Sequence, residues 1–156
     1  MEIRELSLDE FNEAFRLARM VFQEFEAPDY SEEGIQTFSN FLNEPSYTAI
    51  LKIYGAFDNK QLVGILATRS EGDHIALFFV DGKYHRRGVG RQLFEKACLD
   101  NMSGKITVNS SPYAQEIYRH LGFTETDKEQ ITDGLRYIPM ICILELRDQH
   151  MIPHNS

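Results

Sequence analysis

Residues 85–91 combine arginines with glycines in an order that suits anion binding. An apolar run precedes them at residues 75–80 and a helical pattern follows at residues 93–98, so they lie where a strand turns into a helix. The first turn of a helix has backbone N–H groups without partners and partial positive charge, and glycines let a phosphate approach them. Arginines are unfavourable at this end of the helix dipole unless an anion is present. The segment therefore predicts a phosphate site, the alternative being an ordinary helix start with a basic first turn. It consists of His85, Arg86, Arg87, Gly88, Val89, Gly90 and Arg91.

The composition indicates one globular domain. Of the 156 residues, 42% are hydrophobic and 26% are charged, so the chain can bury a core without a metal or a disulfide. The net charge of −8 argues against broad nucleic-acid binding, and it suits a cationic substrate or simply an acidic protein.

Neither the cysteines nor the histidines indicate a metal or covalent site. Cys98 and Cys142 fall in apolar patterns and are expected to be buried thiols, and the five histidines share no ligand spacing. Residues 1–5 carry charges where a signal peptide would be apolar, and no apolar run approaches the ~18 residues of a membrane span. We expect a cytoplasmic protein that binds no metal, membrane or nucleic acid.

The first half of the chain predicts two helices and a strand meander. A short strand at residues 3–6 leads into a helix that Ser7 opens with a capping box and Pro28 ends, with apolar residues from Leu8 to Phe25 on one face. A second helix begins at Ser31. Strands are expected at residues 49–54, 62–68 and 74–80, and the last of these leads into the glycine-rich turn.

The second half predicts a βαβ unit and the closing strands. The helix from Gly88 ends near residue 100, and the strand at residues 105–109 should lie parallel to residues 74–80. Ser111 is expected to cap a helix that has Pro112 at its first position and ends at Gly122. Strands from Phe123 and over residues 135–146 complete the sheet. We expect one α/β domain over residues 1–146, with a mixed twisted sheet of six to seven strands and helices on both faces, and a loose polar tail over residues 147–156.

Two motifs together resemble the GCN5-related N-acetyltransferase (GNAT) superfamily. The first is the glycine turn, whose superfamily pattern is Gln or Arg, two residues, Gly, one residue, then Gly or Ala; Gly88 and Gly90 match it. The second is Ala114-x-x-x-Tyr118-x-x-x-Gly122-Phe123. The resemblance covers residues 51–146 in element order and is most specific over residues 77–123. The first position of the turn is His85, a departure from the pattern, and the neighbouring arginines supply charge there.

The resemblance implies that acetyl-CoA is the cosubstrate, and it assigns a role to each of several residues. The N–H groups of residues 87–91 would hold the pyrophosphate. The strand before the turn would separate from its parallel neighbour at a bulge, so that the backbone of Phe79 and Val80 pairs with the pantetheine amides; the alternative is a plain core strand. Tyr118 would protonate the CoA thiolate, unless it only packs. Asn109 would bond the pantetheine arm or form an Asx turn. The predicted cofactor-binding residues are Phe78, Phe79, Val80, Arg86, Arg87, Gly88, Val89, Gly90, Arg91, Asn109, Ser111 and Tyr118.

The base that deprotonates the acceptor amine is less well specified. His74 takes the position at which the histone-acetylating branch has a glutamate, and an imidazole can act at neutral pH; the alternative is a surface histidine. Glu24, Glu26 and Asp29 could act as base or attract a cationic substrate, and a water-mediated transfer needs no single base. Glu24, Glu26 and Tyr30 are the predicted substrate contacts.

The resulting prediction is transfer of an acetyl group to a primary amine of a small molecule, by direct attack in a ternary complex. The aromatic-rich residues 22–30 favour a small acceptor over a protein N-terminus or lysine, which is the alternative. A CoA-binding sensor is a second class, although it has no need of a thiolate acid such as Tyr118. A nucleotide-binding protein would need a P-loop Lys-Ser/Thr or a third glycine. The resemblance also allows a homodimer.

Overall fold

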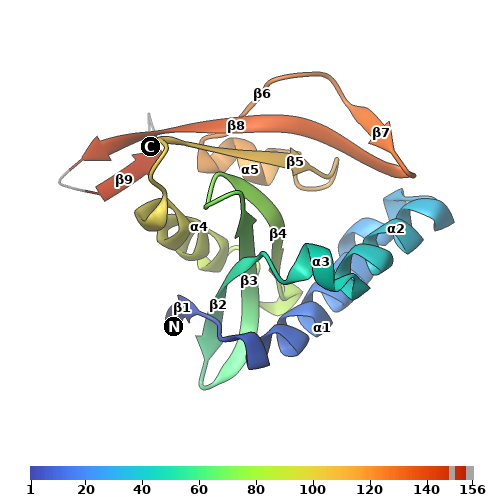
Figure 1. Cartoon of the computed structure of the whole chain (residues 1–156), viewed down its shortest axis with the longest axis horizontal. Helices are drawn as coiled ribbons and strands as arrows, with labels where there is room; N and C mark the ends of the chain where they lie inside the picture. The colour runs from blue at the N-terminus through green and yellow to red at the C-terminus, as the bar shows by residue number, and fades with distance from the viewer. Residues whose placement is uncertain (148–149, 154–156) are drawn as a thin grey trace.

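A single curved sheet runs through the molecule, with helices packed on both of its faces (Figure 1). The computed structural model describes residues 1–147 and 150–153. The strands follow the order β1-β2-β3-β4-β5-β8-β6, and the short strands β7 and β9 also pair with β8. The strands are β1 (Glu2–Glu5), β2 (Lys52–Asp58), β3 (Gln61–Arg69), β4 (His74–Val80), β5 (Lys105–Ser110), β6 (Thr124–Glu125), β7 (Gln130–Thr132), β8 (Leu135–Arg147) and β9 (His150–Pro153).

The helices separate into two groups by the face of the sheet that they cover. They are α1 (Phe11–Val21), α2 (Glu32–Asn43), α3 (Pro45–Thr48), α4 (Val89–Asp100) and α5 (Gln115–Leu121). On one face, α1 and α2 bury Phe15, Ala18 and Leu42 against β2 to β4. On the other face, α4 and α5 bury Phe94 and Tyr118. The predicted mixed sheet with helices on both faces is confirmed, and β4–β5 is its parallel pair.

Several predicted boundaries differ from the structure for local reasons. The predicted strand at residues 49–54 begins only at Lys52, because Glu44 caps the extra helical turn α3. Ser111 caps a turn through its bonds to the N–H of Ala114, and regular helix starts at Gln115 rather than Pro112. The first helix starts at Phe11 after a 3-10 turn, so Leu8 lies outside the buried face and is exposed.

The predicted loose tail is wrong for the part of it that the structure describes. Arg147 belongs to β8, and His150–Pro153 form β9, which pairs antiparallel with the end of β8. Met151 packs against the core on the α4 side, which gives this strand an apolar anchor. Residues 148–149 and 154–156 of the predicted tail lie outside the described residues.

A bulge in β4 opens the sheet at its centre. In the pairing with β3, Ala67 lies opposite Leu77 and Thr68 lies opposite Ile75, so Ala76 is the extra residue. Within the described chain, β4 and β5 pair only at His74–Thr107 and Ile75–Val108, after which the two strands separate. A bulge bends its strand and increases the local twist, which explains why the separation starts there. The predicted splay of this strand is therefore present.

The hairpin formed by β7 and β8 reaches across the sheet to α2 (Figure 1). Its turn residue Gly134 lies so close to Gly34 of α2 that a side chain on either glycine would overlap the other's backbone. The hydroxyl of Thr37 donates to the carbonyl of Asp133 over 2.7 Å, and that of Tyr30 donates to the carbonyl of Arg136 over 3.0 Å. Glycine at residue 34 thus permits close packing of the hairpin on the helix.

We expect Gly34→Ala to destabilise the protein, because the added methyl group would force α2 away from the hairpin. The expected loss is about 1–3 kcal/mol in the free energy of unfolding, measured by urea denaturation. At an exposed helical site the same change would instead increase stability, so the sign is diagnostic. Gln36→Ala, on the exposed side of α2, is the control and should change stability by less than about 0.5 kcal/mol. A stabilised Gly34→Ala variant would contradict the close contact.

Candidate functional site

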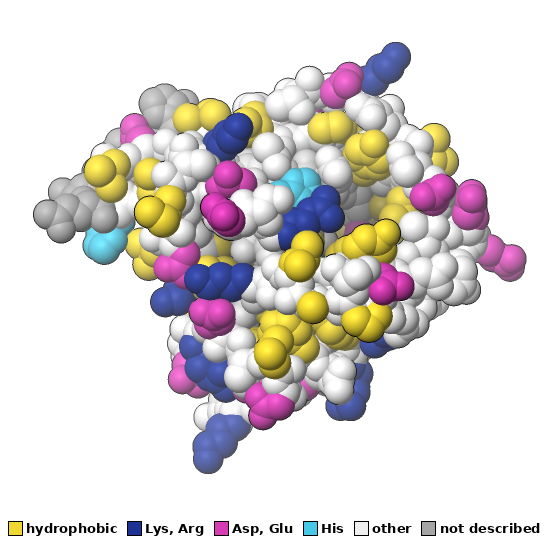
Figure 2. All heavy atoms as spheres, in the orientation of Figure 1, with side chains coloured by type: hydrophobic (Ala, Val, Ile, Leu, Met, Phe, Trp, Pro, Cys, Tyr) yellow, Lys and Arg dark blue, Asp and Glu magenta, His cyan; other side chains and the backbone are white. Residues whose placement is uncertain are grey.

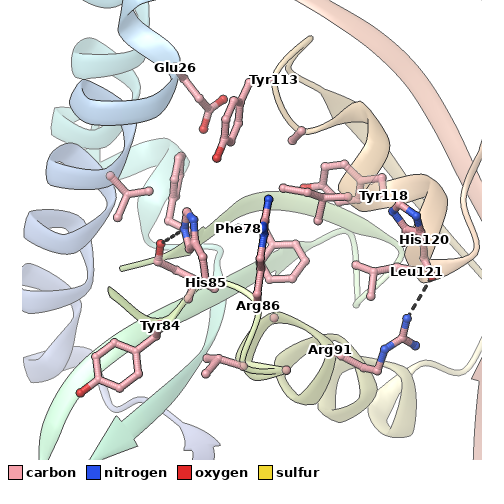
Figure 3. Close-up of a pocket in the computed structure, with 18 residues that line it drawn as sticks. Glu26, Phe78, Tyr84, His85, Arg86, Arg91, Tyr113, Tyr118, His120 and Leu121 are labelled. Carbon is pink, nitrogen blue, oxygen red and sulfur yellow. Dashed lines mark hydrogen bonds between the residues drawn. The ribbon is translucent and has the colours of Figure 1, made fainter. Parts of the chain in front are cut away.

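A cleft with a volume of about 530 Å³ opens where β4 and β5 separate. Its walls come from the end of β4, the turn that leads into α4, and α5 (Figure 3). The side of the cleft near α1 is completed by Val21 and Glu26. The cleft therefore joins the two predicted motifs, the glycine turn and the tyrosine helix, in one site.

The glycine turn presents the start of α4 to this cleft. Gly88 is the residue before the helix and has a φ of +80°, and a Cβ built on it would have no atom within 4 Å. Arg86 also has a positive φ, +64°. Positive φ values next to a helix start turn successive N–H groups toward one concave surface, which suits an anion. Gly88, Val89, Gly90 and Arg91 all line the cleft.

The arginines of the turn have different positions. Arg86 lines the cleft, and its side chain points into it (Figure 3). The guanidinium of Arg87 instead lies over the ring of Tyr84, 5.3 Å from its centroid, and Arg87 does not line the described cleft. Arg91 donates one hydrogen bond of 3.0 Å to the carbonyl of His120, which ties α4 to α5.

His85, which stands where the superfamily pattern has Gln or Arg, has a structural role. Its Nε2 atom lies 2.7 Å from the carbonyl oxygen of Val80, so this nitrogen carries the proton and donates to the strand. The ring also packs on Phe25, with a centroid separation of 4.7 Å. His85 thereby links the turn, the end of β4 and the segment after α1.

The backbone groups of successive β4 residues point alternately toward β3 and toward the cleft. The N–H of Asp81 donates to the carbonyl of Val63 over 2.8 Å. Because bonded residues alternate along an antiparallel pair, Phe79 directs its backbone groups to Ile65 in β3. Phe78 and Val80 therefore direct theirs toward the cleft. The prediction that the backbone of Phe79 faces the ligand is corrected to Phe78, while Val80 is retained.

Tyr118 lies on the wall of the cleft, in α5. Its ring packs edge-on against Phe78 and Phe123, at centroid separations of 5.9 and 5.2 Å. Burial raises the pKa of its hydroxyl well above the ordinary value, and the charge of Glu26 acts in the same direction. The phenol is therefore a neutral proton donor at physiological pH.

A second hollow of about 370 Å³ lies on the other side of Phe78 and Tyr118. An aromatic stack forms part of its wall: the ring of Phe22 is stacked with Tyr30 at 5.7 Å and with Phe38 at 4.0 Å. Residues of the β7–β8 hairpin, including Asp133 and Arg136, close its far side. The predicted substrate residue Tyr30 is therefore part of a real hollow, which we call the aromatic hollow.

The predicted residues Asn109 and Ser111 line the aromatic hollow rather than the cleft. His74 lines a third hollow of about 620 Å³ further along β4. It lines neither the cleft nor the aromatic hollow, and Tyr118 lines both. Its Nδ1 atom lies 2.8 Å from the hydroxyl of Thr107, and burial lowers its pKa to about 4. The structure thus does not bring His74 together with Tyr118. Glu24 is exposed and lines none of the three hollows described.

Part of the cleft wall was not predicted from the sequence. The further lining residues are Val21, Tyr84, Tyr113, Ala114, Ile117, His120 and Leu121. Leu121 follows Tyr118 by three residues, lies on the same helical face and could have been found from that spacing. Tyr84 donates a 2.6 Å hydrogen bond to Asp58 in β2, a long-range contact that no local pattern indicates.

Neither a metal-binding group nor a membrane-spanning helix is found among the described residues. Among the described residues, no group of three or more His, Cys, Asp or Glu side chains is placed to hold a metal ion. The described helices include none that is both long and apolar enough to cross a membrane. On the face drawn in Figure 2, acidic and basic side chains are interspersed.

Comparisons with known proteins agree with this geometry. Residues 26–144 match the family model of the acetyltransferase (GNAT) domain. A GCN5-related N-acetyltransferase from Rhodopseudomonas palustris has a TM-score of 0.76 at 20% identity, over 90% of this chain and 93% of that one. The PaiA N-acetyltransferase from Thermoplasma acidophilum, solved in complex with coenzyme A, has a TM-score of 0.65 at 21% identity, over 89% and 96%. YjaB from Escherichia coli, in its apo form, has a TM-score of 0.70 at 20% identity, over 90% and 95%. At these identities the solved structures show a shared fold, and the family match over most of its length shows that the chain belongs to the GNAT acetyltransferase family.

Proposed function

We propose that the protein transfers the acetyl group of acetyl-CoA to a primary amine of a small molecule, by direct attack in a ternary complex. The observation that carries this proposal is the set of groups that line the cleft and the adjoining aromatic hollow, which share five lining residues. A helix start with open N–H groups is followed by the free edge of β4, then by a buried tyrosine, and then by the aromatic hollow. A donor with a pyrophosphate at one end and a thioester at the other would match this order. PaiA, which shares the fold, was solved with coenzyme A.

The described residues include groups that would bind the donor and protonate its leaving sulfur. The N–H groups at the start of α4 would hold the pyrophosphate. The backbone groups of Phe78 and the N–H of Val80 would pair with the pantetheine amides, because the Val80 carbonyl already accepts from His85. One of these N–H groups would donate to the thioester oxygen as it gains negative charge. The neutral amine nitrogen forms the new C–N bond, the C–S bond breaks, and Tyr118 gives its proton to the departing sulfur. The nitrogen then loses one proton, which restores the Tyr118 hydroxyl.

The aromatic hollow favours a small acceptor. It is walled by three stacked rings and closed by the β7–β8 hairpin, so its size and apolar lining suit a small amine with an apolar body. Aromatic faces also attract an ammonium group. A protein N-terminus or a lysine side chain is the alternative acceptor.

We expect purified protein to release CoA thiol from acetyl-CoA in the presence of small apolar primary amines. The panel should include arylalkylamines, alkylamines, polyamines, and peptides with a free N-terminus or a lysine, compared by kcat/KM. Higher kcat/KM with peptides would assign the acceptor to proteins. CoA binding by calorimetry without turnover on any amine would favour a sensor.

We expect Gly88→Leu to abolish CoA binding measured by calorimetry. A leucine would be strained at a φ of +80°, and its side chain would occupy the open space beside the N–H groups. Gly72→Leu is a matched control, because Gly72 has a φ of +87°, also has no atom within 4 Å of a built Cβ, and lies outside the cleft. Equal CoA affinity in the two variants would place the phosphate site elsewhere.

We expect Tyr118→Phe to lower kcat by about 10²-fold while leaving CoA affinity nearly unchanged, because the phenol acts only when the thiolate leaves. Tyr54→Phe is the control: Tyr54 is also buried, but its hydroxyl bonds Asp100 over 2.6 Å, away from the cleft. Turnover of Tyr118→Phe at the wild-type rate would exclude the phenol as the acid.

A further inference from the structure

The cleft and the aromatic hollow share one wall. Five residues line both: Glu26, Phe78, Phe79, Ala114 and Tyr118. Two of these have side chains that exchange protons, Glu26 and Tyr118. If the donor lies in the cleft and the acceptor in the hollow, as the proposed function requires, the reacting atoms meet at this wall. Both proton-transferring side chains then lie beside them.

An irregular turn after α1 places Glu26 there. Residues Phe22–Glu26 form a wide π-type turn, a feature that often occurs at functional sites. Its first residue, Phe22, is the central ring of the aromatic stack, and its last residue, Glu26, points into the cleft beside Tyr113 (Figure 3). Glu24 in the same turn is exposed. The turn therefore supplies both a wall of the acceptor hollow and a carboxylate at its mouth.

The surroundings of Glu26 strengthen it as a base. Burial raises the pKa of its carboxyl above the ordinary value, the charge of Asp29 acts in the same direction, and the Ser111 hydroxyl opposes them. Three tyrosine hydroxyls from different segments, Tyr30, Tyr113 and Tyr118, have pKa values that the charge of Glu26 raises further. From the glycine turn, His85 and Arg86 point toward the same cleft (Figure 3). A carboxylate with a raised pKa binds a proton more tightly and is a better general base near neutral pH.

We propose that Glu26 is the general base that takes the proton from the ammonium group of the acceptor, opposite Tyr118 as the acid. An N–H bond of the ammonium breaks and the proton passes to a carboxylate oxygen of Glu26. The freed electron pair attacks the acetyl carbon, the C–S bond breaks, and the sulfur takes the proton of Tyr118. The nitrogen then loses its second proton to the tyrosinate, which restores the phenol and leaves a neutral amide, and Glu26 releases its proton to solvent. This assignment rests on the proposed function, and it selects Glu26 over His74, Glu24 and Asp29 among the candidate bases that the sequence left open.

The test compares kcat/KM of the wild type and Glu26→Gln as a function of pH, with the best amine of the panel. In the wild type, the carboxylate should let the abundant ammonium form react, so kcat/KM should be nearly flat between the pKa of Glu26 and that of the amine. In Glu26→Gln only the neutral amine can react, so kcat/KM should rise tenfold per pH unit. The advantage of the wild type should be about 10²-fold near neutral pH and should shrink toward the pKa of the amine. The loss should also be smaller for a fluorinated amine of lower pKa.

Two further variants complete the experiment. Glu26→Asp keeps a carboxylate and should retain the flat pH profile at a reduced rate, which guards against a general defect in Glu26→Gln. Glu13→Gln removes the same charge from an exposed position of α1 and should behave as the wild type. CoA affinity, measured by calorimetry, should be equal in all four proteins.

The possible outcomes distinguish failure of the proposed acetyltransferase function from failure of the assignment of Glu26 as the base. A wild type that turns over no amine would overturn the proposed function and this assignment together. A wild type that turns over while Glu26→Gln keeps its rate, or loses rate by a factor independent of pH, would overturn the assignment alone. In that case Glu26 only shapes or charges the acceptor hollow.

Discussion

The bulge at Ala76 is the constraint on which the site depends. Without it, β4 would continue to pair with β5, and its edge groups would be used inside the sheet. With it, the strand bends away after two paired positions and leaves a row of backbone groups facing a cleft. The extra residue also reverses the alternation of side chains, so that Ala76 and Leu77 both pack on the α1 side. Phe78 and Val80 then contact the α4 side, and their backbone groups face the opening.

The gap is held open by contacts from elements that are distant in sequence. His85 bonds the carbonyl of Val80 and packs on Phe25, while Arg91 bonds the carbonyl of His120. The turn, the strand end and α5 are thus fixed relative to one another. Rigid placement matters because a reaction between two bound molecules gains a large part of its rate from alignment of the reacting atoms.

The predictable part of this protein is the part that depends on local pattern. The strand at residues 74–80, the helix after Gly88 and the cap at Gly122 were predicted correctly, because periodicity and glycine conformation determine them locally. The parallel pairing of β4 with β5 followed from the handedness of βαβ connections. These local signals were sufficient to predict the family and the positive-φ turn that precedes α4.

The errors arose where tertiary contacts decide the outcome. Whether the backbone groups of Phe78 or those of Phe79 face the cleft depends on the register of β4 with β3. The sequence of one strand does not reveal that register. The pairing of β9 with β8 depends on Met151 reaching a core assembled from elsewhere. His74 and Glu26 are both plausible proton acceptors in sequence. Their different positions relative to Tyr118 follow from the π-type turn after α1 and from the course of β4, and neither is encoded in a motif.

The contact between Gly34 and Gly134 has a consequence for how the acceptor site could diversify. The donor cleft is built from β4, the glycine turn and α5, whereas the far side of the aromatic hollow is built from α2 and the β7–β8 hairpin. The cleft and the aromatic hollow have five lining residues in common, including Glu26 and Tyr118. A change in the length or sequence of the hairpin would therefore reshape the aromatic hollow and leave the cleft's own elements in place. Under the proposed function, the choice of acceptor and the binding of the donor are separable properties, which meet at the five residues that line both cavities.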